Sequence, residues 1–143
     1  MVELVGVYLV SGSPAQVRST LQDREVVGRL VPALAALVPV GPGEYAGTLV
    51  VGRPPLCRTY PARLEVREEP DGQEVVVDLR GTGRAVQLRA TARCRLEPGA
   101  EGTTVRYALA AELGPLGPLA APAAQRLVGD FFRGLDEELA HGS

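Results

Sequence analysis

The chain has 143 residues, and its 15 basic and 17 acidic side chains leave a net charge of −2. This length fits one domain that buries a single core without structural metals or disulfides. Both signs of charge are interspersed along the chain, so overall charge makes no case for binding nucleic acid or an anionic membrane.

The first residues do not form a targeting segment. Glu3 stands where a signal peptide carries basic residues, and no stretch reaches the roughly 18 apolar residues of a transmembrane helix. Cys57 and Cys94 have neither metal-motif spacing nor a histidine partner, which predicts two reduced thiols. We therefore expect a cytoplasmic protein with no metal and no cofactor.

The chain begins with an alternating segment, residues 3–10, that predicts a β-strand. Apolar groups lie on both of its faces, which are Leu4, Gly6, Tyr8 and Val10 on one side and Val5, Val7 and Leu9 on the other. Such a strand has an outer face that a partner would cover.

Two short helices are predicted next. Ser13 and Pro14 form an N-cap followed by proline at the first helical position, which predicts a helix to about Leu21. Asp23 caps a second short helix, and Pro32 ends it.

Six further strands are expected before residue 114. Gly41-Pro42-Gly43 joins strands 34–40 and 44–51 into a hairpin. Later strands begin near Thr59, Glu74, Val86 and Val105, and each alternates between an apolar and a charged face. The charged face carries Arg63, Arg67, Arg89, Arg93, Arg95 and Arg106 together with Glu65, Asp78 and Glu112. Cross-strand ion pairing is therefore favoured over an anion or nucleic-acid site.

The last predicted element is a long amphipathic helix over Leu119–Leu139. Leu127, Phe131 and Leu135 are expected to be buried, with Arg126, Arg133 and Glu137 exposed. Its inward residues are small at the start and large at the end, so we expect it to press on the sheet at one end and stand off at the other. The order of elements predicts an α+β fold, in which one domain over residues 1–143 wraps a curved seven-stranded antiparallel sheet around this helix.

This order is similar to the helix-grip fold of the START-like (SRPBCC) superfamily. The stretches that resemble its carbon monoxide dehydrogenase CoxG branch are Asp23-Arg24-Glu25-Val26 running to Val31-Pro32, Val51-Gly52-Arg53-Pro54, and Asp130-Phe131-Phe132. The resemblance implies an apolar cavity between sheet and long helix for a lipid-like, quinone-like or polycyclic ligand, and no family-wide catalytic residue. It also implies that Leu30, Val31 and Pro32 flank the mouth of this cavity.

Candidate catalytic residues are few. His141 is the only histidine and is the third residue from the end, while Asp136, Glu137 and Glu138 occupy consecutive helical positions. No triad, histidine-based zinc site or paired acid and base follows from them, which argues against a cyclase-like or hydrolase enzyme.

The leading hypothesis is a non-catalytic protein that binds a hydrophobic small molecule. Its expected ligand-binding residues are Tyr8, Tyr45, Leu49, Leu64, Val77, Leu88, Tyr107, Leu109, Ala123 and Leu127, with Leu30 and Pro32 at the mouth. Core packing explains the tyrosines as well as polar anchoring of a ligand does. The alternative is an accessory or assembly subunit of a molybdenum-containing carbon monoxide dehydrogenase-type enzyme, or a homodimer, acting through Val5, Val7 and Leu9.

Overall fold

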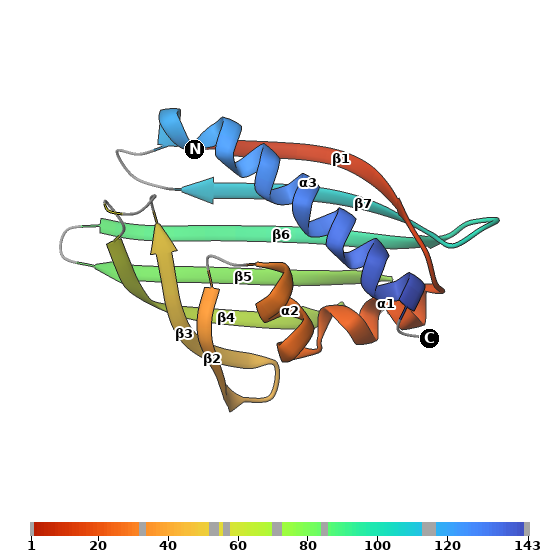
Figure 1. Ribbon diagram of the computed structural model, residues 1–143, viewed down its shortest axis with the longest axis horizontal. Helices are drawn as coiled ribbons and strands as arrows, with labels where there is room; N and C mark the ends of the chain where they lie inside the picture. The colour runs from red at the N-terminus through yellow and green to blue at the C-terminus, as the bar shows by residue number, and fades with distance from the viewer. Residues whose placement is uncertain are drawn as a thin grey trace.

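A single antiparallel sheet of seven strands forms one layer of the fold, and three helices form the other (Figure 1). The computed structural model describes residues 2–31, 34–51, 55, 58–69, 73–83, 86–112 and 117–141. In chain order the elements are β1 (Val2–Val10), α1 (Pro14–Leu21), α2 (Arg24–Leu30), β2 (Leu34–Gly41), β3 (Glu44–Val51), β4 (Arg58–Glu68), β5 (Glu74–Gly83), β6 (Val86–Pro98), β7 (Thr103–Glu112) and α3 (Gly117–His141).

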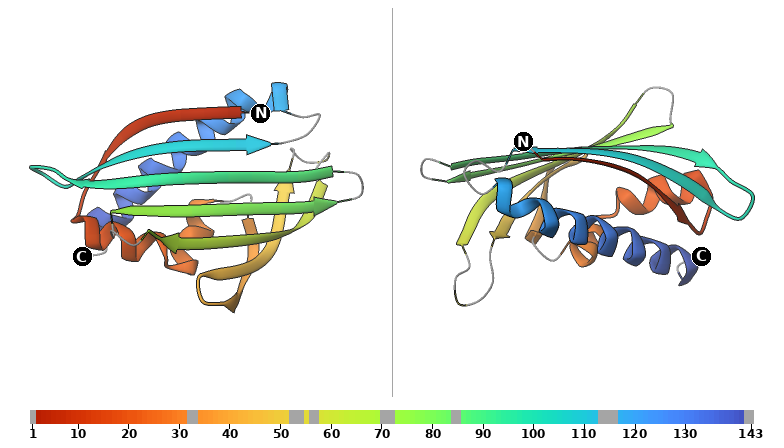
Figure 2. Two further views of the ribbon diagram at one scale, coloured as in Figure 1. Left: turned by 180° about the vertical axis from the view of Figure 1, so that it is seen from behind. Right: turned by 90° about the horizontal axis from the view of Figure 1, so that it is seen from above.

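The strands are arranged in the order β1-β7-β6-β5-β4-β3-β2, so β1 and β2 are the two edges. All three helices lie on the same side of the curved sheet (Figure 2). This confirms the predicted α+β architecture, including the place of the two short helices after the first strand. We call the side that faces the helices the inner face.

Both short helices begin at the predicted N-caps. The Ser13 hydroxyl accepts a hydrogen bond from the Gln16 N–H at 3.2 Å, and the Gln16 side chain accepts one from the Ser13 N–H at 2.7 Å. A carboxylate oxygen of Asp23 accepts from the Glu25 N–H at 3.0 Å. Each cap satisfies amide groups that have no partner inside the helix.

The long helix α3 crosses the inner face, and its buried side is displaced by one residue from the predicted one. Phe132 (4% exposed) and Leu135 (0%) are buried, whereas Phe131 is only half-buried. The apolar series on α3 therefore includes Val128, Phe132, Leu135 and Leu139. Arg126, Arg133 and Glu137 are exposed as expected, and the side chain of Leu127 lies outside the described residues.

The outer face of the sheet carries the predicted ion pairs. Arg67 binds Asp78 at 2.5 Å and Arg93 binds Glu74 at 3.0 Å. Val76 is fully buried although it lies on this face, because the register places it between the two arginines. Long arginine stems can cover an apolar neighbour in this way.

Candidate functional site

The centre of the inner face is less well covered than its two ends. At one end, Val75 and Val105 are fully buried, and Leu96 is 2% exposed. At the other end, Leu34 and Leu88 are each 5% exposed. Between these ends lies a group of half-buried side chains, which we call the central inner patch: Val77, Leu79, Ala90, Ala92, Tyr107 and Leu109.

The central inner patch belongs to strands that have neighbours on both sides. Ala92 pairs with Val77 on β5 and with Leu109 on β7, and Ala90 pairs with Leu79 in the next row. Because strands flank these residues, their exposed area faces the space between sheet and helices. The packing of α3 is thus tight around Phe132 and Leu135 and incomplete over the middle of the sheet, in the uneven manner that the sequence predicted.

An aromatic group borders this patch on the β1 side. Tyr8 stacks on Phe132 with ring centroids 4.6 Å apart, and the Tyr107 ring lies 5.3 Å from Phe132 and 5.9 Å from Tyr8. Gly6 leaves room for this arrangement, since a Cβ there would lie 2.7 Å from the Tyr107 hydroxyl oxygen. The two tyrosine rings and Phe132 therefore form a fixed apolar wall.

The tyrosine hydroxyls differ in their partners. Tyr45 donates to the Gln22 carbonyl at 3.3 Å, which ties β3 to the link between α1 and α2. For Tyr8 and Tyr107, no hydrogen bond is found within the described residues. Burial, together with the proximity of Tyr8, raises the pKa of Tyr107, so this hydroxyl remains protonated and able to donate at neutral pH.

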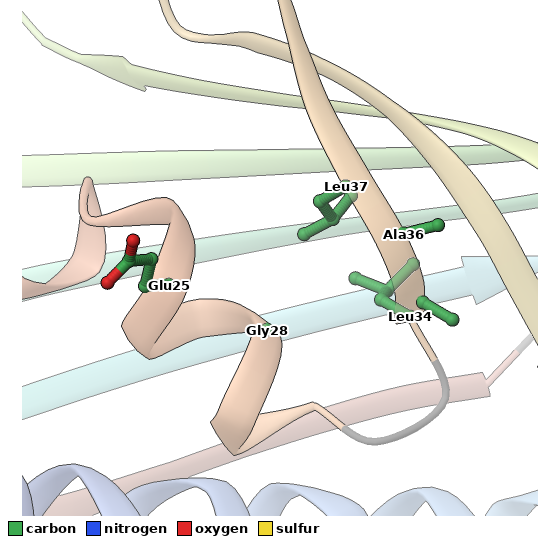
Figure 3. A pocket seen from close by; sticks show the side chains of 6 residues that line it. Glu25, Gly28, Leu34, Ala36 and Leu37 are labelled. Atoms are coloured by element: carbon green, nitrogen blue, oxygen red, sulfur yellow. The ribbon is translucent and has the colours of Figure 1, made fainter.

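A cleft of about 460 Å³ lies between α2 and β2. Glu25 and Gly28 line it from α2, and Leu34, Ala35, Ala36 and Leu37 line it from β2 (Figure 3). Leu34 belongs to the buried core, and Leu37 packs against that core. The floor of the cleft is therefore also part of the interior.

The expected ligand-binding residues fall into three groups. Tyr8, Val77, Tyr107 and Leu109 are half-buried at or beside the central inner patch. Leu49, Leu64 and Leu88 are buried in the core, Tyr45 is half-buried against it, and Leu30 packs against Gly134 of α3, where a Cβ would lie 2.6 Å from the leucine Cδ2. Pro32 and the side chains of Ala123 and Leu127 lie outside the described residues.

Sequence reasoning did not select several residues that the structure brings to these places. Leu79, Ala90 and Ala92 share the inward phase of their strands, and that phase was the available signal. Gly28 and Leu37 line the cleft because a short helix and an edge strand meet there. No local pattern reveals that meeting.

Catalytic and metal-binding chemistry finds little support in the described part of the chain. No group of three or more potential metal ligands occurs among these residues. Burial raises the pKa of the Cys94 thiol to about 12, and the charge of Glu74 adds to this effect. A thiol of this kind is unreactive at neutral pH. Among the described helices, none combines the length and hydrophobicity needed to cross a bilayer.

Solved structures with low sequence identity share this fold. A conserved protein from Geobacillus kaustophilus is 23% identical, with 97% of this chain and 95% of that chain covered and a TM-score of 0.82. A STAR-related lipid transfer protein fragment from Xanthomonas axonopodis is 19% identical, with 97% and 86% covered and a TM-score of 0.65. The di-domain ARO/CYC protein StfQ of the steffimycin biosynthetic pathway is 14% identical, with 95% and 49% covered and a TM-score of 0.69.

These likenesses confirm the helix-grip fold. Comparison with curated proteins gives no significant match. The pattern of the CoxG family, which is named for a carbon monoxide dehydrogenase subunit, in contrast matches residues 6–140. Because this match spans nearly the whole sequence, the chain belongs to the carbon monoxide dehydrogenase CoxG family.

Proposed function

We propose that this protein binds a hydrophobic small molecule between the inner face of the sheet and α3, and that it catalyses no reaction. The ligand is lipid-like, quinone-like or polycyclic. The observation that carries the proposal is the central inner patch, whose apolar side chains remain half-buried although their strands lie inside the sheet. An apolar ligand would complete the burial that the helices leave unfinished.

Burial of apolar surface would supply the affinity. Each Å² of apolar surface removed from water contributes about 25 cal/mol, so about 200 Å² would contribute about 5 kcal/mol before the costs of association. The Tyr8 and Tyr107 hydroxyls, for which the described residues provide no partner, are placed to orient a polar atom of the ligand.

The distribution of polar groups supports binding rather than turnover. The described side chains of the central inner patch are apolar except for the Tyr107 hydroxyl. The carboxylates of Glu74 and Asp78 pair with arginines on the outer face. General acid–base catalysis needs a proton-transferring group within hydrogen-bond reach of the substrate. The fold that this chain shares with a STAR-related lipid transfer protein is also consistent with binding.

A matched pair of tryptophan variants tests the proposal. Ala92→Trp places a large ring in the central inner patch, whereas Ala108→Trp places the same ring on the exposed outer face of β7. In a titration with the neutral dye Nile red, we expect Ala92→Trp to weaken binding by about tenfold or more, because the ring occupies the apolar site. Ala108→Trp should leave it unchanged. Equal affinities in the two folded variants would contradict the proposal.

A second candidate function is that of an accessory or assembly subunit of a carbon monoxide dehydrogenase-type enzyme, or of a homodimer. The observation that favours it is the exposure of Val5 (79%), Val7 (52%) and Leu9 (77%) on the outer face of edge strand β1. An apolar row on an edge strand suits a protein interface. Under this function Val7→Glu would abolish assembly and leave dye binding intact, since an unpaired charge in an apolar interface is costly.

A further inference from the structure

Two residues that line the α2–β2 cleft are locally unfavourable. Gly28 occupies the interior of α2, where glycine is among the least favourable residues, and a Cβ at this position would have no atom within 4 Å. Ala36 has a φ of +56°, in the left-handed region that residues other than glycine rarely adopt. Packing does not require the glycine, and strained backbone positions gather at functional sites.

One layer of side chains separates this cleft from the interior. The strained backbone at Ala36 coincides with an irregular register in β2 between Ala35 and Val38. Leu37 then lies over Gly47, where a Cβ would approach its Cδ2 to 2.9 Å. Leu34 and Leu37 thus face the cleft on one side and the core on the other (Figure 3).

The attachments of α2 lie away from the cleft. Arg29 binds Glu138 of α3 at 2.9 Å on the surface, and Leu30 packs against Gly134. Within the described residues, no hydrogen bond or ion pair joins α2 directly to β2. The two elements meet at the link between them, where the Leu34 N–H donates to the Val31 carbonyl at 2.9 Å. Movement of α2 about this link would widen the cleft without breaking a bond across it.

We propose that the hydrophobic ligand reaches the inner face of the sheet through the α2–β2 cleft, with Leu34 and Leu37 as the barrier and α2 as the element that yields. This inference rests on the proposed binding function. It adds that the cleft is a passage and not the final binding place, since the half-buried apolar surface lies beyond the barrier. A residue that fills a passage changes the rates of binding and release together and leaves the equilibrium nearly unchanged.

Stopped-flow fluorescence with Nile red tests this passage. Gly28→Trp fills the cleft, and we expect the association and dissociation rates both to fall by about tenfold or more while the Kd stays within about twofold. Leu37→Ala lowers the barrier, and we expect both rates to rise. Gly28→Ala and Glu25→Gln are matched controls that change the helix or the charge of the cleft without closing it, and they should leave the rates unchanged.

The possible outcomes separate this inference from the proposed function. If the unmutated protein binds no dye, lipid or quinone, the proposed function fails and the passage fails with it. If the unmutated protein binds but Gly28→Trp and Leu37→Ala leave both rates unchanged, only the passage is overturned. A higher Kd in Gly28→Trp with unchanged association would make the cleft the binding place itself, which also overturns the inference. Should Gly28→Trp not fold, an unchanged association rate in Leu37→Ala overturns it alone.

Discussion

Asp78 shows how one residue on the outer face links stability to pH. Partial burial raises the pKa of its carboxyl, but hydrogen bonds from Thr91 at 2.6 Å and Arg67 at 2.5 Å, together with the arginine charges, outweigh burial and lower the pKa. A carboxylate with a lowered pKa stabilises the folded state above its unfolded pKa, which is about 3.9. That contribution is lost as the pH falls through the folded pKa.

We predict that Asp78→Asn is less stable than the unmutated protein at pH 7 and that the difference shrinks below about pH 4. Urea unfolding at a series of pH values measures this. A difference that stays constant across the series would show that the ionised carboxylate contributes nothing specific.

The tyrosines show what residue-level reasoning can and cannot settle. Alternation along the strands correctly places Tyr8, Tyr45, Tyr60 and Tyr107 on the inner face. It does not reveal that Tyr45 finds the Gln22 carbonyl, because that partner lies in a link 23 residues away. Hydrogen-bond partners from distant segments are fixed by tertiary packing and have no local sequence signal.

At the scale of single elements, α3 provides a direct test of helix orientation. Phe131 and Phe132 are chemically identical neighbours, yet only Phe132 is buried, where it touches Tyr8 and Tyr107. We predict that Phe132→Ala lowers the free energy of unfolding by about 3–5 kcal/mol and that Phe131→Ala lowers it clearly less. Chemical denaturation of both variants measures the difference. The reverse order would mean that α3 presents the face that the sequence suggested.

The same comparison explains why the helix was predictable and its face was not. Apolar residues recur every three or four positions from Leu119 onward, so the existence of α3 follows from its sequence. With Leu127 and Val128 adjacent, and Phe131 next to Phe132, two inward faces one residue apart are both apolar. Gly134 favours the observed face, because its missing side chain admits Leu30.

At the scale of the whole molecule, the sequence predicts which side chains point inward but not which of them are covered. Leu64 and Val77 share the same inward phase on neighbouring strands, yet Leu64 is 4% exposed and Val77 is half-buried. Coverage depends on where α1, α2 and α3 lie over the sheet. The candidate site is therefore a property of the assembled layers, whereas the fold follows from alternation, turns and caps.

Native mass spectrometry of the protein purified without organic solvent tests the central claim, binding of a hydrophobic ligand on the inner face, most directly. We predict a species heavier than the chain by one small molecule, its loss after organic extraction, and its return when a lipid extract is added back. The Ala92→Trp variant, prepared in parallel, should lack the added mass, because its ring fills the central inner patch. If the unmutated protein carries no added mass and takes up none from the extract, the account of a ligand-binding protein is contradicted.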